Sequence, residues 1–187
     1  MPIETYITRY FPPIYGVRAR AVNCTNCGAP MRVEEDRDYL VCDFCGSTHL
    51  PEADAEGVRM LGEVDRSECP VCHVALVHAA VSGCRLLFCG RCRGFLVTVD
   101  TFMGLVSALR SRQSAGDPAP VRWKDLGRHI RCPRCFRHMD THPYAGPGNV
   151  IIDNCPHCRL NWLDHMELIR IATSPERRYN EDAWATQ

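Results

Sequence analysis

The sequence predicts a small β-rich protein of three tandem hairpin units, the last two each followed by a short α-helix. Two observations support this fold class. The 187-residue chain has 13 cysteines, and twelve of them form six Cys-x-x-Cys pairs. Leu, Ile, Val and Phe together number only 42, close to the ~20% below which chains bury too little apolar surface to fold. Metal ions bound by the cysteines, rather than disulfides or one large apolar core, are therefore expected to hold each unit.

The spacing of the cysteine pairs is typical of zinc ribbons. Taken two at a time, the pairs enclose 14, 16 and 19 residues, against roughly 15–20 in the ribbon pattern. Two such turns facing each other across a hairpin complete a tetrahedral shell of four thiolates, and four protein ligands make the site structural. We expect three structural Zn²⁺ ions; a single iron in each site stays open as an alternative. The predicted ligands are Cys24, Cys27, Cys42, Cys45, Cys69, Cys72, Cys89, Cys92, Cys132, Cys135, Cys155 and Cys158.

The residues inside each unit favour β-hairpins. Short apolar stretches alternate with polar residues and are interrupted by turn-forming residues such as Ser82-Gly83. A unit of this size needs a cross-link, because domains below ~40 residues cannot stabilise themselves by burial. The predicted strand pairs are 31–33 with 39–41, 74–78 with 85–88, and 137–139 with 150–152.

Short helices are predicted after the second and third units, near Thr98–Arg110 and Asp164–Thr173. Asp164 is a suitable N-cap, and Glu167 follows three residues later, as in a capping box. Apolar residues recur at helical spacing in both segments. Such stripes usually pack on the core, so the helices are expected to lie on their own ribbons or on each other.

The second and third units form an internal repeat, since Cys69 maps to Cys132 at an offset of 63. The third unit, from Cys132-Pro133-Arg134-Cys135 through Trp162-Leu163-Asp164, resembles the bacterial TFIIB-type zinc-ribbon family over about 40 residues. The second unit resembles that family more loosely, and the first resembles a generic zinc ribbon. The resemblance implies structural zinc binding.

Six segments are predicted. They are an aromatic arm (1–20), ribbon 1 (21–60), ribbon 2 with its helix (61–111), a basic linker (112–130), ribbon 3 with its helix (131–174) and a polar tail (175–187).

The charges cancel overall, with 22 basic and 22 acidic residues, but not locally. Residues 21–60 carry a net charge of −5 (3 basic, 8 acidic), which repels phosphate. Residues 112–137 carry +5 (7 basic, 2 acidic) and include an aromatic residue, a combination that suits single-stranded nucleic acid. The possible contacts are Arg122, Trp123, Lys124, Arg128 and Arg131. Alternatively, the segment is a solvated linker that Trp123 anchors to a ribbon.

The N-terminal arm is the other candidate contact region. Its aromatic residues Tyr6, Tyr10, Phe11 and Tyr15 either pack across the ribbons or bind a partner protein.

The leading hypothesis is a non-enzymatic, zinc-stabilised adaptor that binds a protein partner. The runner-up is a transcription- or RNA-associated protein. A redox switch through the unpaired Cys84 is a weaker hypothesis, because a small buried cysteine is the simpler interpretation. We find no catalytic nucleophile with its base, no phosphate loop and no open metal site, so no enzyme and no small-molecule substrate are expected. The start of the chain lacks a secretory pattern and no apolar run is long enough to span a membrane, so a cytoplasmic protein is expected.

Overall fold

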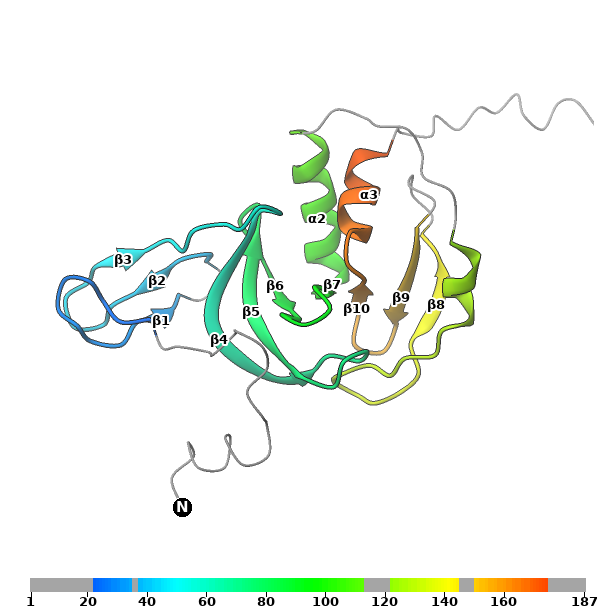
Figure 1. Cartoon of the computed structure of the whole chain (residues 1–187), viewed down its shortest axis with the longest axis horizontal. Helices are drawn as coiled ribbons and strands as arrows, with labels where there is room; N and C mark the ends of the chain where they lie inside the picture. Colours follow the sequence, from blue (N-terminus) through cyan, green and yellow to red (C-terminus); the bar gives the residue numbers. More distant parts are fainter. Residues whose placement is uncertain (1–21, 35–36, 113–121, 145–149, 175–187) are drawn as a thin grey trace, which may run out of the picture.

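The structure, a computed structural model, describes residues 22–34, 37–112, 122–144 and 150–174. Within them the strands form two antiparallel sheets (Figure 1). The smaller sheet belongs to ribbon 1 and contains β1 (Arg32–Val33), β2 (Leu40–Val41) and β3 (Thr48–His49). The first predicted hairpin is therefore present, with β3 as an additional strand.

The larger sheet combines ribbons 2 and 3 in seven strands, ordered β4-β5-β6-β7-β10-β9-β8. Its members are β4 (Val58–Glu68), β5 (Ala75–Val81), β6 (Cys84–Phe88), β7 (Phe95–Thr98), β8 (Asp140–Pro143), β9 (Ile151–Cys155) and β10 (Leu160–Leu163). The Ser82-Gly83 turn between β5 and β6 has φ of 50° and 81°, the two positive values of a type I′ hairpin turn. The second predicted hairpin is thus also present. In the third, the prediction of residues 137–139 as the first strand was wrong: β8 begins at Asp140, and its residues pair with Ile151–Asn154 of β9.

Ribbons 2 and 3 share this sheet because their equivalent last strands pair. β7 and β10 run antiparallel, with Leu96 opposite Trp162 and Phe95 opposite Leu163. Two equivalent strands paired in this way relate the two ribbons by an approximate two-fold axis between them. The two units of the internal repeat therefore form one quasi-symmetric body that shares a sheet, rather than two independent domains.

The sequence does not predict β4, which pairs with β5 along most of its length. The domain boundary placed between residues 60 and 61 falls inside this strand. Register shifts between Met60 and Val64, and again before Glu68, interrupt the alternation by which a strand is recognised.

Helix α2 (Val99–Arg110) follows β7 as predicted, and the Thr98 side chain accepts a hydrogen bond from the Thr101 amide at 3.1 Å. Helix α3 (Glu167–Thr173) begins three residues later than predicted. The prediction of Asp164 as N-cap was wrong because Met166 adopts a left-handed conformation, with φ of 70°. One half of the capping box is present: the Glu167 carboxylate accepts the Asp164 amide at 2.7 Å.

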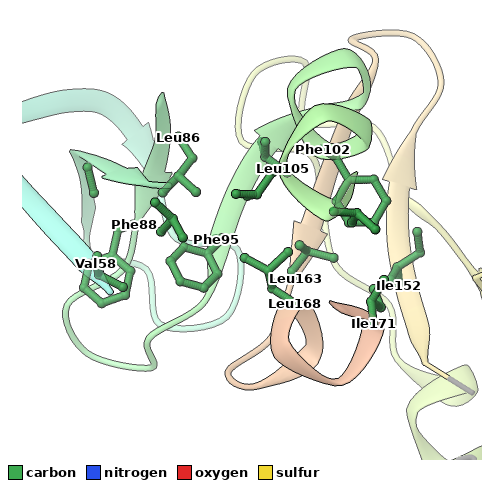
Figure 2. Packing of buried hydrophobic residues seen from close by; sticks show 14 of the residues in the cluster. Val58, Leu86, Phe88, Phe95, Phe102, Leu105, Ile152, Leu163, Leu168 and Ile171 are labelled. Atoms are coloured by element: carbon green, nitrogen blue, oxygen red, sulfur yellow. The ribbon is translucent and has the colours of Figure 1, made fainter. Parts of the chain in front are cut away.

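The two faces of the larger sheet carry different cores. The two helices lie side by side over one face (Figure 1), where Phe88, Phe95, Phe102 and Leu163 belong to one buried cluster (Figure 2). Leu87, Leu96 and Trp162 belong to a second cluster that includes the cysteines of ribbons 2 and 3. Adjacent strand residues point to opposite faces, so the helices cover one face and the cysteine sites the other.

Candidate metal centres

The Cys-x-x-Cys pairs lie in tight turns with a common backbone pattern. In the first turn, the Cys24 amide donates to the Ala29 carbonyl oxygen at 2.8 Å, and the Gly28 amide donates back to the Cys24 carbonyl oxygen at 2.8 Å. The same two bonds recur at the turns that begin with Cys42, Cys69, Cys89 and Cys132. Each such turn directs two sulfur atoms toward one point.

The residue after the second cysteine is left-handed in all six turns. These residues are Gly28, Gly46, His73, Arg93, Phe136 and Arg159, with φ between 53° and 75°. Glycine adopts this conformation freely, whereas other residues lose roughly 1–2 kcal/mol. The four turns of ribbons 2 and 3 are thus strained locally, and the surrounding sheet must hold them in place, with help from a metal ion where one binds.

The sulfur atoms have the spacing that a tetrahedral metal ion requires. The four ligand atoms of each group lie within 4.8 Å of one another. Neighbouring sulfurs are 3.4 Å apart for Cys27 and Cys42, and 3.6 Å apart for Cys69 and Cys92. A zinc–sulfur bond of ~2.3 Å gives tetrahedron edges of about 3.8 Å, so the cysteines fit zinc with little adjustment. Four thiolates leave no position for a bound water.

Hydrogen bonds already favour thiolates at some of these positions. The Ser47 hydroxyl lies 3.1 Å from the Cys45 sulfur and lowers the pKa of that thiol to about 6. A backbone hydrogen bond from Arg137 lowers the pKa of Cys135 to about 7. In ribbon 2, hydrogen bonds from the Cys69 and Cys92 thiols hold the pKa of Cys89 far below 9. The thiols of Cys69 and Cys92, which donate to Cys89, have raised pKa values themselves, so the protons of the metal-free site are shared unequally among its cysteines. A bound metal ion would displace these protons, because metal ions bind the deprotonated form.

The three sites differ in how far they are shielded from water. Cys27 and Cys45 of ribbon 1 are exposed, whereas all four cysteines of ribbons 2 and 3 are buried or half-buried. The sites of ribbons 2 and 3 lie in the second core cluster, while Leu40 is the one buried non-cysteine hydrophobic side chain among the described residues of ribbon 1 before Val58. Ribbon 1 therefore depends on its metal more than the fused body does.

Trp162 belongs to the core cluster that contains the cysteines of ribbons 2 and 3. Its side chain is fully buried, and its indole nitrogen donates to the Asp164 carboxylate at 3.0 Å. A Cβ atom added to Gly94 would lie 2.3 Å from the Trp162 ring. Gly94 follows the Cys89–Cys92 turn, and its carbonyl oxygen accepts a hydrogen bond from the Cys89 amide. Glycine is required here because the tryptophan of ribbon 3 packs directly on the metal turn of ribbon 2.

A buried ion-pair network connects the basic segment to ribbon 3. The Arg128 guanidinium contacts the carboxylates of Asp153 and Asp164, and Asp153 is completely buried. Burial beside Asp164 raises the pKa of Glu167 to about 8. The interpretation of Arg128 as a nucleic-acid contact has to be revised, because its charge is already taken up within the protein. The sequence analysis did not identify Asp153 as a buried ion-pair residue. The one indication in the sequence was a carboxylate that directly follows the apolar residues of a predicted strand.

The other predicted contact residues are distributed differently. Arg122, Trp123, Lys124 and Arg131 are exposed. Trp123 lies in η1 (Trp123–Gly127), a 3-10 helix, and is 66% exposed, so it does not anchor the segment to a ribbon. The arm residues Tyr6, Tyr10, Phe11 and Tyr15 lie outside the described residues. Cys84 is half-buried and packs against the core cluster under the helices.

Comparison with known proteins identifies ribbon 1. Residues 21–50 match the family described as the A2-L zinc ribbon domain. No curated protein and no solved structure matches the chain. Together with the three four-cysteine groups, the match shows a protein of zinc ribbons with structural four-cysteine sites. Among the described residues, no helix is both long and apolar enough to cross a membrane.

Proposed function

We propose that the chain is a non-enzymatic adaptor in which zinc holds three ribbons, and ribbon 1 docks on a protein partner. The proposal includes no catalytic step, because four thiolates would fill each zinc shell. It places the protein in the cytoplasm, where thiols stay reduced. The resemblance of ribbon 3 to the TFIIB-type family adds structural zinc to this proposal but no substrate.

One observation carries the docking role: Phe44 is 87% exposed, more than any other large hydrophobic side chain among the described residues. Phe44 lies between two ligand cysteines, so the metal turn would fix its position in advance. A preordered side chain loses little conformational entropy on binding. Burying it completely in a partner is worth about 1.5–3 kcal/mol.

The surroundings of Phe44 support a partner surface of one kind. Ribbon 1 is separate from the larger sheet (Figure 1), and its segment carries a net charge of −5. Part of this charge is paired within the protein, since Asp43 contacts Arg32 and Asp54 contacts Arg93, whereas Glu52 is exposed. The surface that fits is an apolar pocket with a basic rim, where charge complementarity adds speed and specificity of association.

The experiment is affinity capture from native lysate treated with nuclease, comparing wild type with Phe44→Ala. The matched control is Phe136→Ala, which removes an exposed phenylalanine beside a metal turn of ribbon 3. We expect Phe44→Ala to lose the captured protein and Phe136→Ala to retain it, with zinc content unchanged in both. Equal capture by all three proteins would refute the role of Phe44.

The N-terminal arm is a second proposed contact. Deleting residues 1–15 removes Tyr6, Tyr10, Phe11 and Tyr15 together. The truncated protein should keep its zinc and bind the partner more weakly. Unchanged binding would remove the arm from the proposal and leave Phe44 as its basis.

A further inference from the structure

The edge of ribbon 3 has a surface unlike that of ribbon 1. The chain from η1 to Cys132 runs antiparallel to β8 and the residues before it. The Thr141 hydroxyl donates to the Arg128 carbonyl oxygen at 3.1 Å, and the Met139 amide donates to the Ile130 carbonyl oxygen at 3.0 Å. The basic segment that the sequence presented as a linker is thus attached along ribbon 3 and ends at its metal turn.

Alternation along this pairing sorts the side chains into two sets. Ile130, Cys132 and Met139 are buried at 6%, 0% and 5% exposure. The intervening residues His129, Arg131 and His138 are therefore exposed. Arg131 and His138 lie opposite each other. The centroids of the imidazole rings of His129 and His138 are 6.4 Å apart, in an edge-to-face arrangement.

Two large aromatic side chains stand at the ends of this exposed strip. Trp123 is 66% exposed in η1, and Phe136 is 70% exposed at the metal turn. Phe136 has φ of 60°, at a position where ribbon 1 uses Gly28 and Gly46. A phenylalanine that is both exposed and left-handed gains nothing from packing and loses backbone stability. This combination points to a use outside the fold.

The cations of the strip are available for a ligand. Arg122, Lys124, Arg134 and Arg137 are exposed, and among the described residues none of them makes an ion pair. Arg131 donates to the Phe136 carbonyl oxygen at 3.1 Å, so its guanidinium lies at the aromatic turn.

Carboxylates close to the strip are few. Asp125 and Asp140 belong to the same segments. Asp65 of β4 lies near enough for the charge of Arg134 to contribute to lowering its pKa. Arg128 adds no free charge because Asp153 and Asp164 hold it, but this pairing anchors the strip to ribbon 3.

We propose that this strip binds single-stranded nucleic acid. Unpaired bases stack on Trp123 and Phe136, and the free arginines and Lys124 contact the phosphates. Paired bases cannot stack on projecting rings in this way, so a duplex is a poorer ligand. The five steps from Phe136 to Thr141 span about 17 Å at about 3.3 Å per step, enough for up to about five stacked nucleotides at about 3.4 Å each.

The test is fluorescence anisotropy of the zinc-loaded full chain with labelled 12-mer oligo(dT) and oligo(rU), and with a duplex of the same length. Four phosphate contacts predict that affinity for the single strand falls about 50-fold between 50 and 200 mM salt, as 4 raised to 0.7 × 4. Duplex binding should be weaker at both salt concentrations.

Variants separate stacking from charge. Phe136→Gly fits the left-handed position without strain, so the fold is retained. It should lose at least about fivefold in affinity, since one base stacked on an aromatic is worth about 1 kcal/mol or more. Lys124→Ala removes one of the four phosphate contacts and should flatten the salt dependence to about 18-fold, as 4 raised to 0.7 × 3. Phe44→Ala is the matched control and should bind as wild type, whatever it does to protein capture.

Three results would overturn the proposal: no binding at 50 mM salt, equal affinity for the duplex, or full affinity of Phe136→Gly. Loss of a nuclease-resistant protein partner in Phe136→Gly, with no oligonucleotide binding by wild type, would assign the strip to a protein instead. Failure of this proposal leaves the docking role of Phe44 untouched, because the two surfaces share no residue.

Discussion

Gly94→Ala tests whether Trp162 locks the two fused ribbons together. The new Cβ would lie 2.3, 2.9 and 3.0 Å from three atoms of the indole ring, where carbon atoms need about 3.5–4.0 Å. Trp162 is fully buried and hydrogen-bonded to Asp164, so the ring cannot move into solvent. Overpacking of this kind costs about 1–3 kcal/mol, and a broken indole hydrogen bond adds about 1 kcal/mol.

The measurement is the free energy of unfolding from urea titrations at a fixed excess of zinc, which keeps the metal contribution equal. We expect Gly94→Ala to lose about 2–4 kcal/mol. Gly104→Ala is the matched control: its Cβ would meet nothing within 4 Å in helix α2, so it should gain up to ~1 kcal/mol.

A loss below ~0.5 kcal/mol in Gly94→Ala would show that the ring adapts, and would refute this account of the contact. The same substitution in a Trp162→Phe background sharpens the test. Phenylalanine lacks the ring atoms that the new Cβ meets, so Gly94→Ala should cost less there. Equal costs in the two backgrounds would also contradict the reasoning.

Three further predictions follow from the metal sites and the buried network. Excess chelator should remove the metal of ribbon 1 first, because Cys27 and Cys45 are exposed; a metallochromic dye should show one fast and two slow equivalents, and a single phase for all three would contradict this order. Burial raises the pKa of Glu167 to about 8 in the folded protein, against an ordinary 4.5. Between these two values the folded state holds a proton that the unfolded state has lost, so the free energy of unfolding falls as pH rises. Glu167→Gln should therefore gain on wild type by about 1.4 kcal/mol per pH unit between about pH 6 and 8, and a constant difference in urea unfolding would rule out this titration. Arg128→Met should cost about 3–5 kcal/mol by leaving Asp153 buried and unpaired, and Arg128→Met/Asp153→Asn should recover part of it in the same assay; a loss that the second change does not reduce would argue against the pairing.

The metal-binding turns, the hairpin turn and the first helix cap could be predicted because each depends on a short stretch of sequence. A Cys-x-x-Cys turn depends on a few adjacent residues, and the hairpin spacing brings two turns together. The Ser82-Gly83 turn and the Thr98 cap are local in the same sense. Helix α3 departed from prediction because Asp164, a good cap by type, is engaged by Trp162 and by Arg128 from 36 residues away.

The predicted contact residues show the limit of reading charge from sequence. Arg128 and Arg131 belong to the same basic segment and look equivalent there. One is held by buried carboxylates from distant strands, while the other reaches the exposed turn at Phe136. Phe44 and Phe136 likewise read as ordinary apolar residues, and only their exposure distinguishes them from core phenylalanines such as Phe88.

Spacing along the chain was enough to predict the three groups of four cysteines, the hairpins that carry them and the repeat of ribbons 2 and 3. Contacts between distant segments were needed to show that these two ribbons share one sheet through β7 and β10. The same contacts show which charged side chains are paired within the protein and which remain free. Strand pairing between repeats and ion pairs across elements join residues that are far apart in sequence, and side-chain type alone does not specify which distant partner each will meet.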